Sequence, residues 1–133
     1  MAFNLLIVDD SMMTRNIIKK ALSITDYPLG EIHQASNGRE ALELMRQVWI
    51  DLVLADLNMP DMTGAEMVAA MAVDPLLKRT PVIVVSSEGN PQILEELKRK
   101  GVRECVRKPF EPLELQQAVG RVLTEKQDVA PAS

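Results

Sequence analysis

Two short apolar runs in the sequence, Leu5–Val8 and Leu52–Ala55, each end directly in aspartate. Continuous apolar runs of strand length, rich in β-branched residues, are typical of parallel strands buried on both faces. Asp9 and Asp10 follow the first run, and Asp56 follows the second. If the two strands are neighbours, the three carboxylates converge at one edge of the sheet, where open α/β sheets bind their ligands.

Strand-like and helix-like segments alternate five times along the chain, without an internal repeat. This alternation predicts an α/β fold: a doubly wound, five-stranded parallel sheet with helices on both faces. The expected strands are residues 5–8, 31–35, 52–55, 82–85 and 102–106. The second and fifth contain polar residues such as His33 and Glu104, so they suit the partly solvated edges of the sheet. Right-handed crossovers then give the strand order 2-1-3-4-5 of the flavodoxin-like fold, with its ligand crevice between strands one and three.

The spacing of apolar residues also predicts which face each helix buries. The expected positions are Ile17, Ile18, Ala21 and Leu22 in the first helix; Ala41, Leu42, Met45, Val48 and Trp49 in the second; Val68 and Met71 in the third; Ile93, Leu94 and Leu97 in the fourth; and Leu115, Ala118, Val119 and Val122 in the fifth.

The composition narrows the class of protein. A chain of 133 residues with 47% apolar residues fits one domain, which we place at residues 1–124, with residues 125–133 as a tail or linker. A net charge of −4 argues against nucleic acid or an anionic membrane as a direct partner. No apolar stretch has the length of a membrane span and no signal peptide is recognisable, so we expect a cytoplasmic protein. Cys105 is the single cysteine, which excludes an internal disulfide and a Cys/His zinc site.

Converging carboxylates must be compensated electrostatically. Two unit charges about 4 Å apart repel by about 4 kcal/mol at an effective dielectric near 20, so the cluster must take up a proton or bind a cation. Ser86 ends the fourth strand and Lys108 follows the fifth, which adds a hydroxyl and an ammonium to the same rim. Oxygen ligands suit Mg²⁺, and aspartate can accept a phosphoryl group, so these residue types together indicate phosphoryl transfer.

Four motifs give the chain a close resemblance to the response-regulator receiver domains of two-component signalling, of the single-domain CheY-like type. The motifs are Val8-Asp9-Asp10-Ser11, Asp56-Leu57-Asn58-Met59-Pro60 followed by Gly64, Pro81–Ser86, and Lys108-Pro109-Phe110. Each motif alone is weak, but all four in this order and spacing are specific. The resemblance extends from Leu5 to about Leu123.

The resemblance implies a role for each residue of the rim. Asp56 would be the phosphoacceptor, taking its phosphoryl group from a phosphohistidine of a sensor histidine kinase or from a small acyl phosphate. Asp10, Asp56 and the backbone carbonyl of Asn58 would bind Mg²⁺, and Asp9 would act through a metal-bound water. In this family Ser86 would donate a hydrogen bond to the phosphoryl group.

The family pattern also assigns residues around this centre. Lys108 would pair with a phosphoryl oxygen beside a cis Lys108–Pro109 bond, while Asn58 and Glu88 occupy positions that tune how fast the phosphoryl group is lost. Phosphorylation would then switch a surface made by the fourth helix, the fifth strand and the fifth helix, which binds a downstream protein, for example in chemotaxis. The domain would be a regulatory phosphoacceptor that assists its own phosphorylation and dephosphorylation, not an enzyme acting on other substrates.

Two positions depart from the family pattern. Receivers usually have an aromatic residue three positions before the lysine, and this chain has Cys105, whose small thiol cannot sweep the volume of a ring. The coupling of phosphorylation to the switch surface is therefore in question at this position. Ser87 replaces a common alanine, and its hydroxyl would narrow access to the acyl phosphate.

Other functions fit the sequence less well. A haloacid-dehalogenase-type phosphatase needs a second aspartate where this chain has Asn58, and a nucleotide hydrolase needs a glycine-rich phosphate loop that is absent. In a flavodoxin-like FMN carrier, Asp9 and Asp10 would repel the phosphate of the cofactor. Two alternatives stay open: a degenerate receiver that binds proteins without phosphorylation, and the receiver fragment of a larger regulator.

Overall fold

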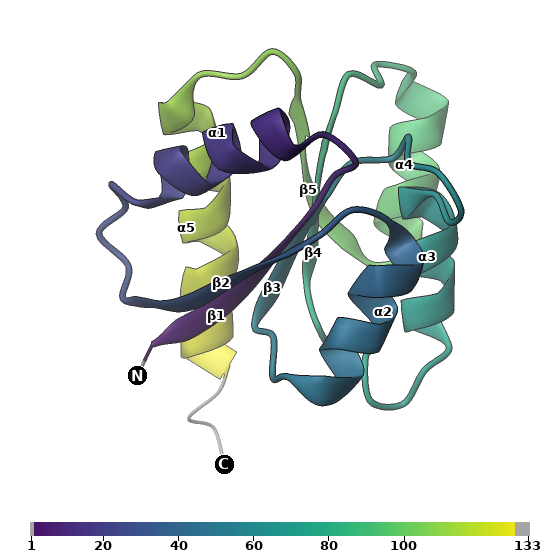
Figure 1. Ribbon diagram of the computed structural model, residues 1–133, viewed down its shortest axis with the longest axis horizontal. Helices are drawn as coiled ribbons and strands as arrows, with labels where there is room; N and C mark the ends of the chain where they lie inside the picture. Colours follow the sequence, from purple (N-terminus) through teal and green to yellow (C-terminus); the bar gives the residue numbers. More distant parts are fainter. Residues whose placement is uncertain (1, 130–133) are drawn as a thin grey trace.

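A computed structural model of the protein describes the backbone of residues 2–129 and the side chains up to residue 125. The elements follow one another as β1 (Phe3–Val8), α1 (Met12–Leu22), β2 (Leu29–Ala35), α2 (Gly38–Gln47), β3 (Leu52–Ala55), α3 (Gly64–Ala72), β4 (Val82–Ser86), α4 (Pro91–Arg99), β5 (Val102–Arg107) and α5 (Pro112–Val129). All neighbouring strands pair in parallel, in the order β2-β1-β3-β4-β5 (Figure 1). The predicted fold class and strand order are confirmed.

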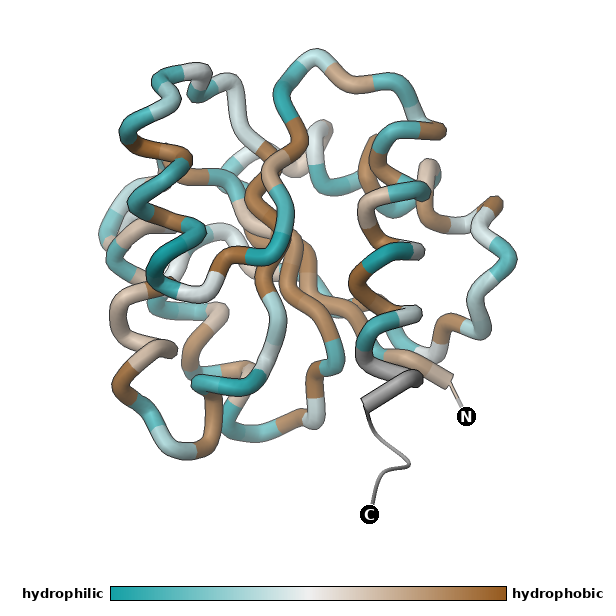
Figure 2. Tube along the Cα trace, turned by 180° about the vertical axis from the view of Figure 1, so that it is seen from behind, coloured by the Kyte–Doolittle hydropathy of each residue, from teal (hydrophilic) through white to brown (hydrophobic). Residues whose placement is uncertain are grey.

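The sheet separates two layers of helices. Helices α1 and α5 lie on one face, and α2, α3 and α4 lie on the other (Figure 1). Side chains alternate along each strand, so Leu5 and Ile7 of β1 face α1 and α5, whereas Leu6 and Val8 face the other layer. Because both faces are covered, the three central strands are apolar except for Asn4 in β1 and Ser86 at the end of β4, and Figure 2 shows the hydrophobic residues concentrated along them.

The edge strands are the polar ones, as the sequence predicts. In β2 the side chains from Gly30 to Gln34 are half-buried or exposed, and in β5 only Val102 and Val106 are buried. Strand β2 begins at Leu29, two residues before the expected start, because Phe3 pairs with Leu29 across the shifted register of β1 and β2. Among the residues that the structure describes, no helix is long and apolar enough to cross a membrane.

Three of the expected buried side chains are exposed. Trp49 is 71% exposed because α2 ends at Gln47, and its Nε1 donates a hydrogen bond to Asp51 from the following extended segment. Ile17 and Ile93 are 54% and 41% exposed, since the sheet-facing stripes of α1 and α4 are narrower than the apolar spacing indicates. The remaining expected positions are buried or half-buried.

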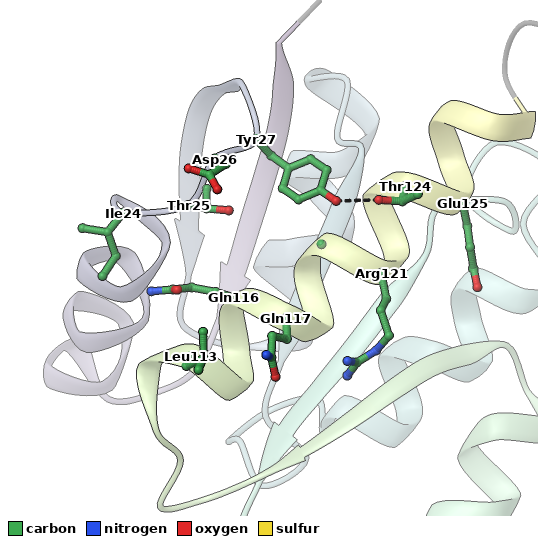
Figure 3. Close-up of a pocket in the computed structure, with 11 residues that line it drawn as sticks. Ile24, Thr25, Asp26, Tyr27, Leu113, Gln116, Gln117, Arg121, Thr124 and Glu125 are labelled. Atoms are coloured by element: carbon green, nitrogen blue, oxygen red, sulfur yellow. Dashed lines mark hydrogen bonds between the residues drawn. The ribbon is translucent and has the colours of Figure 1, made fainter.

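The last helix continues beyond the domain boundary that the sequence suggests. Helix α5 includes residue 124 and extends to Val129, while residues 130–133 lie outside the part of the chain that the structure describes. On its outer side, α5 and the connection from α1 to β2 border a wide groove of about 690 Å³. Figure 3 shows Tyr27 reaching across it to a 2.5 Å hydrogen bond with the hydroxyl of Thr124.

Candidate functional site

The acids meet at the carboxyl edge of the sheet because β1 and β3 end side by side. Val8 lies opposite Ala55 in the paired strands, so the next residues, Asp9 and Asp56, leave the sheet together. The amide of Asp56 still donates to the carbonyl of Val8 at 2.9 Å. Asp10 follows Asp9 before α1 begins, and one carboxylate oxygen from each of the three aspartates lies within 4.8 Å of the other two.

The three carboxylates differ in their surroundings. Asp9 is almost fully buried, and its two oxygens accept hydrogen bonds from the Ser11 amide and from Lys108, each at 2.9 Å. Asp56 is also buried, and its Oδ1 accepts a 2.7 Å hydrogen bond from the amide of Leu57. Asp10 is exposed, and within the described part of the chain no group donates a hydrogen bond to its carboxylate. Asp10 is therefore the carboxylate most open to a ligand.

Lys108 supplies the compensating charge within the protein. Its Nζ lies 2.9 Å from Asp9 Oδ2 and 3.2 Å from Asp56 Oδ2, so one ammonium bridges the two buried acids. Burial opposes the charge of this ammonium, but the hydrogen bonds and negative charges of Asp9 and Asp56 outweigh burial and raise the pKa of Lys108. The peptide bond that follows, Lys108–Pro109, is cis, as the sequence resemblance implies.

Ser86 and its neighbours form the next part of the rim. Ser86 is buried at the end of β4, its Oγ accepts a 3.3 Å hydrogen bond from the amide of Glu88, and its carbonyl accepts one from the amide of Lys108. Ser87 is exposed and Glu88 is half-buried. The fourth strand thereby holds a hydroxyl next to the lysine that bridges the acids.

The loop after Asp56 is held by a close backbone contact. Gly64, the first residue of α3, donates to the carbonyl of Leu57 at 2.9 Å, and a Cβ at this position would overlap the carbonyl oxygen of Asp56. Only glycine fits so close to the backbone. Asn58, which lies between Leu57 and Gly64 in this loop, is exposed to solvent.

Cys105 lies half-buried in β5, where it lines a cavity of about 120 Å³ together with Ser86, Glu88, Leu94 and Arg107. Burial raises the pKa of the Cys105 thiol. The cavity lies between β5 and the start of the β4–α4 loop, directly beside the serine of the rim. The small thiol thus leaves space at the position where the family usually has a ring.

One residue at this rim is missing from the sequence-based site. Arg15, in the first turn and a half of α1, donates a hydrogen bond from Nη1 to the carbonyl oxygen of Asp9 at 2.6 Å. Its position one helical turn after Ser11, the N-cap of α1, is the sequence signal that could have pointed to it, because a side chain there can reach back to the end of β1.

The donor set fits a hard divalent cation. Three carboxylates with oxygens this close together, one of them free of hydrogen bonds, form the kind of oxygen-only site that Mg²⁺ occupies while keeping several waters. The wide groove beside Tyr27 shares none of these residues. The fold and the acidic site together are those of the receiver-like proteins that the four sequence motifs resemble.

Comparison with known proteins gives the family. The family model described as response regulator receiver domain matches residues 5–120, and the chain belongs to this family. The chemotaxis protein CheY of Thermotoga maritima is 32% identical over 123 residues, which cover 92% of this chain and 98% of that protein. CheY of Pseudomonas aeruginosa is 33% identical, covering 89% of this chain and 94% of that protein.

Solved structures agree with this assignment. The chemotaxis response regulator CheY4 of Vibrio cholerae superimposes with a TM-score of 0.81 at 34% identity, covering 92% of this chain and 99% of that one. A chain of the CheX–CheY–BeF3–Mg complex from Borrelia burgdorferi superimposes with a TM-score of 0.81 at 30% identity, covering 91% of this chain and 89% of that one. The protein is therefore a two-component receiver domain homologous to the CheY chemotaxis regulators.

Proposed function

We propose that this receiver is an active phosphoacceptor and that Asp56 accepts the phosphoryl group. The observation that supports this most directly is the bridge from Lys108 to Asp9 and Asp56, because it places a fixed cation within reach of any group bound to Asp56. Asp56 lies at the carboxyl end of a central strand, which is where ligands of this fold class bind. Its Oδ1 is held by the Leu57 amide, so the carboxylate is oriented before a donor arrives.

The acidic cluster would hold Mg²⁺. Asp10, Asp56 and the backbone carbonyl of Asn58 are the proposed direct ligands, and Asp9 is proposed to act through a metal-bound water. The hydrogen bonds that already occupy both oxygens of Asp9 and the absence of any donor to Asp10 among the described residues support this division. When bound, the ion neutralises charge on the incoming phosphoryl oxygens.

The transfer itself moves one phosphoryl group between two nucleophiles. An Asp56 oxygen forms the new bond to phosphorus while the phosphorus–nitrogen bond of a kinase phosphohistidine breaks, and the departing imidazole nitrogen keeps the electron pair. Lys108 would then pair with a phosphoryl oxygen and Ser86 would donate its hydroxyl hydrogen to another. Hydrolysis by water later restores Asp56, and Asn58, Ser87 and Glu88 at the mouth of the site would control how fast that water arrives.

The decisive experiment measures covalent phosphorylation. The purified chain is incubated with Mg²⁺ and acetyl phosphate, the intact mass is measured, and a labile adduct of one phosphoryl group is expected. Asp56→Asn should abolish the adduct. Asp61→Asn is the matched control, because Asp61 is an exposed acid of the same loop. The backbone of Asp61 is left-handed, and asparagine also tolerates that conformation. An adduct that persists in Asp56→Asn would refute the assignment.

Signal output is proposed to pass through the surface formed by α4, β5 and α5, acting in the cytoplasm on a downstream protein, in a chemotaxis pathway. Two ion pairs tie β5 to α5 on this surface, Arg103 with Glu125 at 2.6 Å and Arg121 with Glu104 at 3.0 Å. The presence of Cys105 in this strand favours one alternative, a receiver that binds its partner without phosphorylation. Partner capture that is equal for the wild-type chain with Mg²⁺ and acetyl phosphate and for Asp56→Asn would support that alternative.

A further inference from the structure

Arg15 contacts the backbone that joins the two adjacent aspartates of the site. Its Nη1 donates to the carbonyl oxygen of Asp9 at 2.6 Å, and its Nε donates to Oε1 of Gln34 at 2.9 Å. We propose that Arg15 is a positioning residue for the cation site: it fixes the peptide between Asp9 and Asp10 and so holds the Asp10 carboxylate in place for the ion. This inference rests on the proposed Mg²⁺ site.

Within the part of the chain that the structure describes, the sheet gives no other support to the peptide that Arg15 holds. The amide of Asp9 is the last to pair with β2, donating to Ala35 at 3.1 Å, and the Asp9 carboxylate is held by Ser11 and Lys108. The Asp9 carbonyl comes after the end of β1, where Arg15 is its partner. Because a peptide group is planar, fixing this carbonyl also fixes the amide of Asp10 and the position of the Asp10 Cα, from which its side chain leaves the backbone.

Arg15 is itself held at two places, which makes it a suitable clamp. Its backbone belongs to α1, with its amide donating to Ser11 at 3.0 Å, and its Nε is anchored on Gln34 of β2. Gln34 lies opposite Ile7 in the paired strands, so its own backbone is set by the sheet. The planar guanidinium can donate in both directions with one fixed geometry, which an ammonium cannot reproduce.

Charge and position predict opposite effects of removing Arg15. The guanidinium repels a divalent cation, so if only its charge matters, its removal should strengthen Mg²⁺ binding. If it positions Asp10, its removal should weaken binding, because groups that orient metal ligands typically contribute about 10- to 100-fold to affinity. The direction of the change therefore separates the two roles.

The test is a titration of the purified chain with Mg²⁺ at neutral pH, in which binding is monitored through the backbone amide chemical shifts. Arg15→Ala is expected to raise the dissociation constant for Mg²⁺ by about tenfold, at the lower end of the range for such positioning groups. Arg39→Ala is the matched control, since it removes one positive charge from an exposed arginine that makes no hydrogen bond or ion pair among the described residues. It should change the constant by less than about twofold, in the direction of tighter binding.

Two further variants keep the test decisive if Arg15→Ala is poorly folded. Arg15→Lys retains the charge but cannot make both hydrogen bonds, so it should bind Mg²⁺ more weakly than the wild-type chain. Gln34→Ala retains Arg15 and removes its second anchor, so it should show a smaller loss in the same direction. Thermal unfolding of each variant without Mg²⁺ establishes that the fold is intact.

The outcomes distinguish this inference from the proposed function. If the wild-type chain binds Mg²⁺ and Arg15→Ala binds equally or more tightly, the positioning role is refuted and the proposed phosphoacceptor site is untouched. Wild-type affinity in Arg15→Lys would also refute the role of the two-directional clamp. If the wild-type chain shows no Mg²⁺-dependent shifts at all, the proposed cation site fails, and the positioning role fails with it.

Discussion

Replacing Lys108 by methionine should destabilise the metal-free protein far more than an ordinary lysine substitution. The ammonium lies 2.9 Å and 3.2 Å from two buried carboxylates, and each contact contributes roughly 5 kcal/mol of attraction at an effective dielectric near 20. Most of this attraction is offset by the cost of burying the charge and by repulsion between the two acids. Removal of one partner of a buried pair typically costs 3–5 kcal/mol, and because the Lys108 side chain is 26% exposed we expect about 2–4 kcal/mol.

The measurement is chemical denaturation at pH 7 in the presence of a chelator. Because the pKa of Lys108 is raised in the folded state, its stabilising contribution is complete below the ordinary lysine pKa and is lost only as pH rises through the higher folded value. At pH 7 the whole effect is therefore visible. Lys100→Met is the matched control: its Nζ lies 3.9 Å from Glu96 on the exposed surface of α4, which predicts a loss below about 0.5 kcal/mol.

Added Mg²⁺ gives a second readout of the same reasoning. Lys108 and the proposed ion both use Asp56, so Lys108→Met should bind Mg²⁺ more tightly and gain more stability from it than the wild-type chain gains, by the logarithm of the ratio of the two affinities. The difference between the two proteins should then narrow as Mg²⁺ is added. If Lys108→Met unfolds at the same denaturant concentration as Lys100→Met, the ammonium does not compensate the acids and the electrostatic account of the site is wrong.

Two further predictions concern the loop and the cavity beside the site. Gly64→Ala should destabilise the protein by about 3 kcal/mol, because the new Cβ meets backbone. Gly38→Ala, also at a helix start, places its Cβ mainly against the movable side chain of Met62 and should cost less than about 1 kcal/mol. Equal losses of stability for the two variants in chemical denaturation would contradict this prediction. Cys105 should react with a thiol reagent more slowly at pH 8 than a free cysteine peptide, and its rate should continue to rise above the ordinary thiol pKa. A rate equal to the peptide's would show that the thiol is not shielded.

Much of the fold could be predicted because hydrophobic patterning carries long-range information in a parallel sheet. Apolar runs identified the central strands, and polar residues in β2 and β5 identified the edges, which left one simple order. The exposed Trp49 shows where this reasoning fails. A helical stripe extrapolated past the last helical residue assigns burial to side chains that the turn has already redirected toward solvent.

The site was predictable in outline for a related reason. Parallel strands bring their carboxyl ends to one edge, so acids that follow different strands meet whatever the details of packing. The contact of Arg15 with Asp9 was less predictable, because its position one turn after the N-cap Ser11 only brings it near the end of β1, and a long side chain on α1 has several directions open to it. The close fit of Gly64 against Asp56 depends likewise on the approach of α3, which residue spacing does not encode.

The exposed indole of Trp49 has a practical consequence for fluorescence measurements on this chain. It precedes β3, while Asp56, the proposed acceptor, follows that strand, so the whole length of a buried β-strand, about 13 Å, separates the two. Since the chain has a single tryptophan, its ultraviolet emission samples the opposite pole of the molecule. Binding or phosphorylation at the acidic rim should therefore leave the tryptophan emission nearly unchanged, while global unfolding should change it clearly.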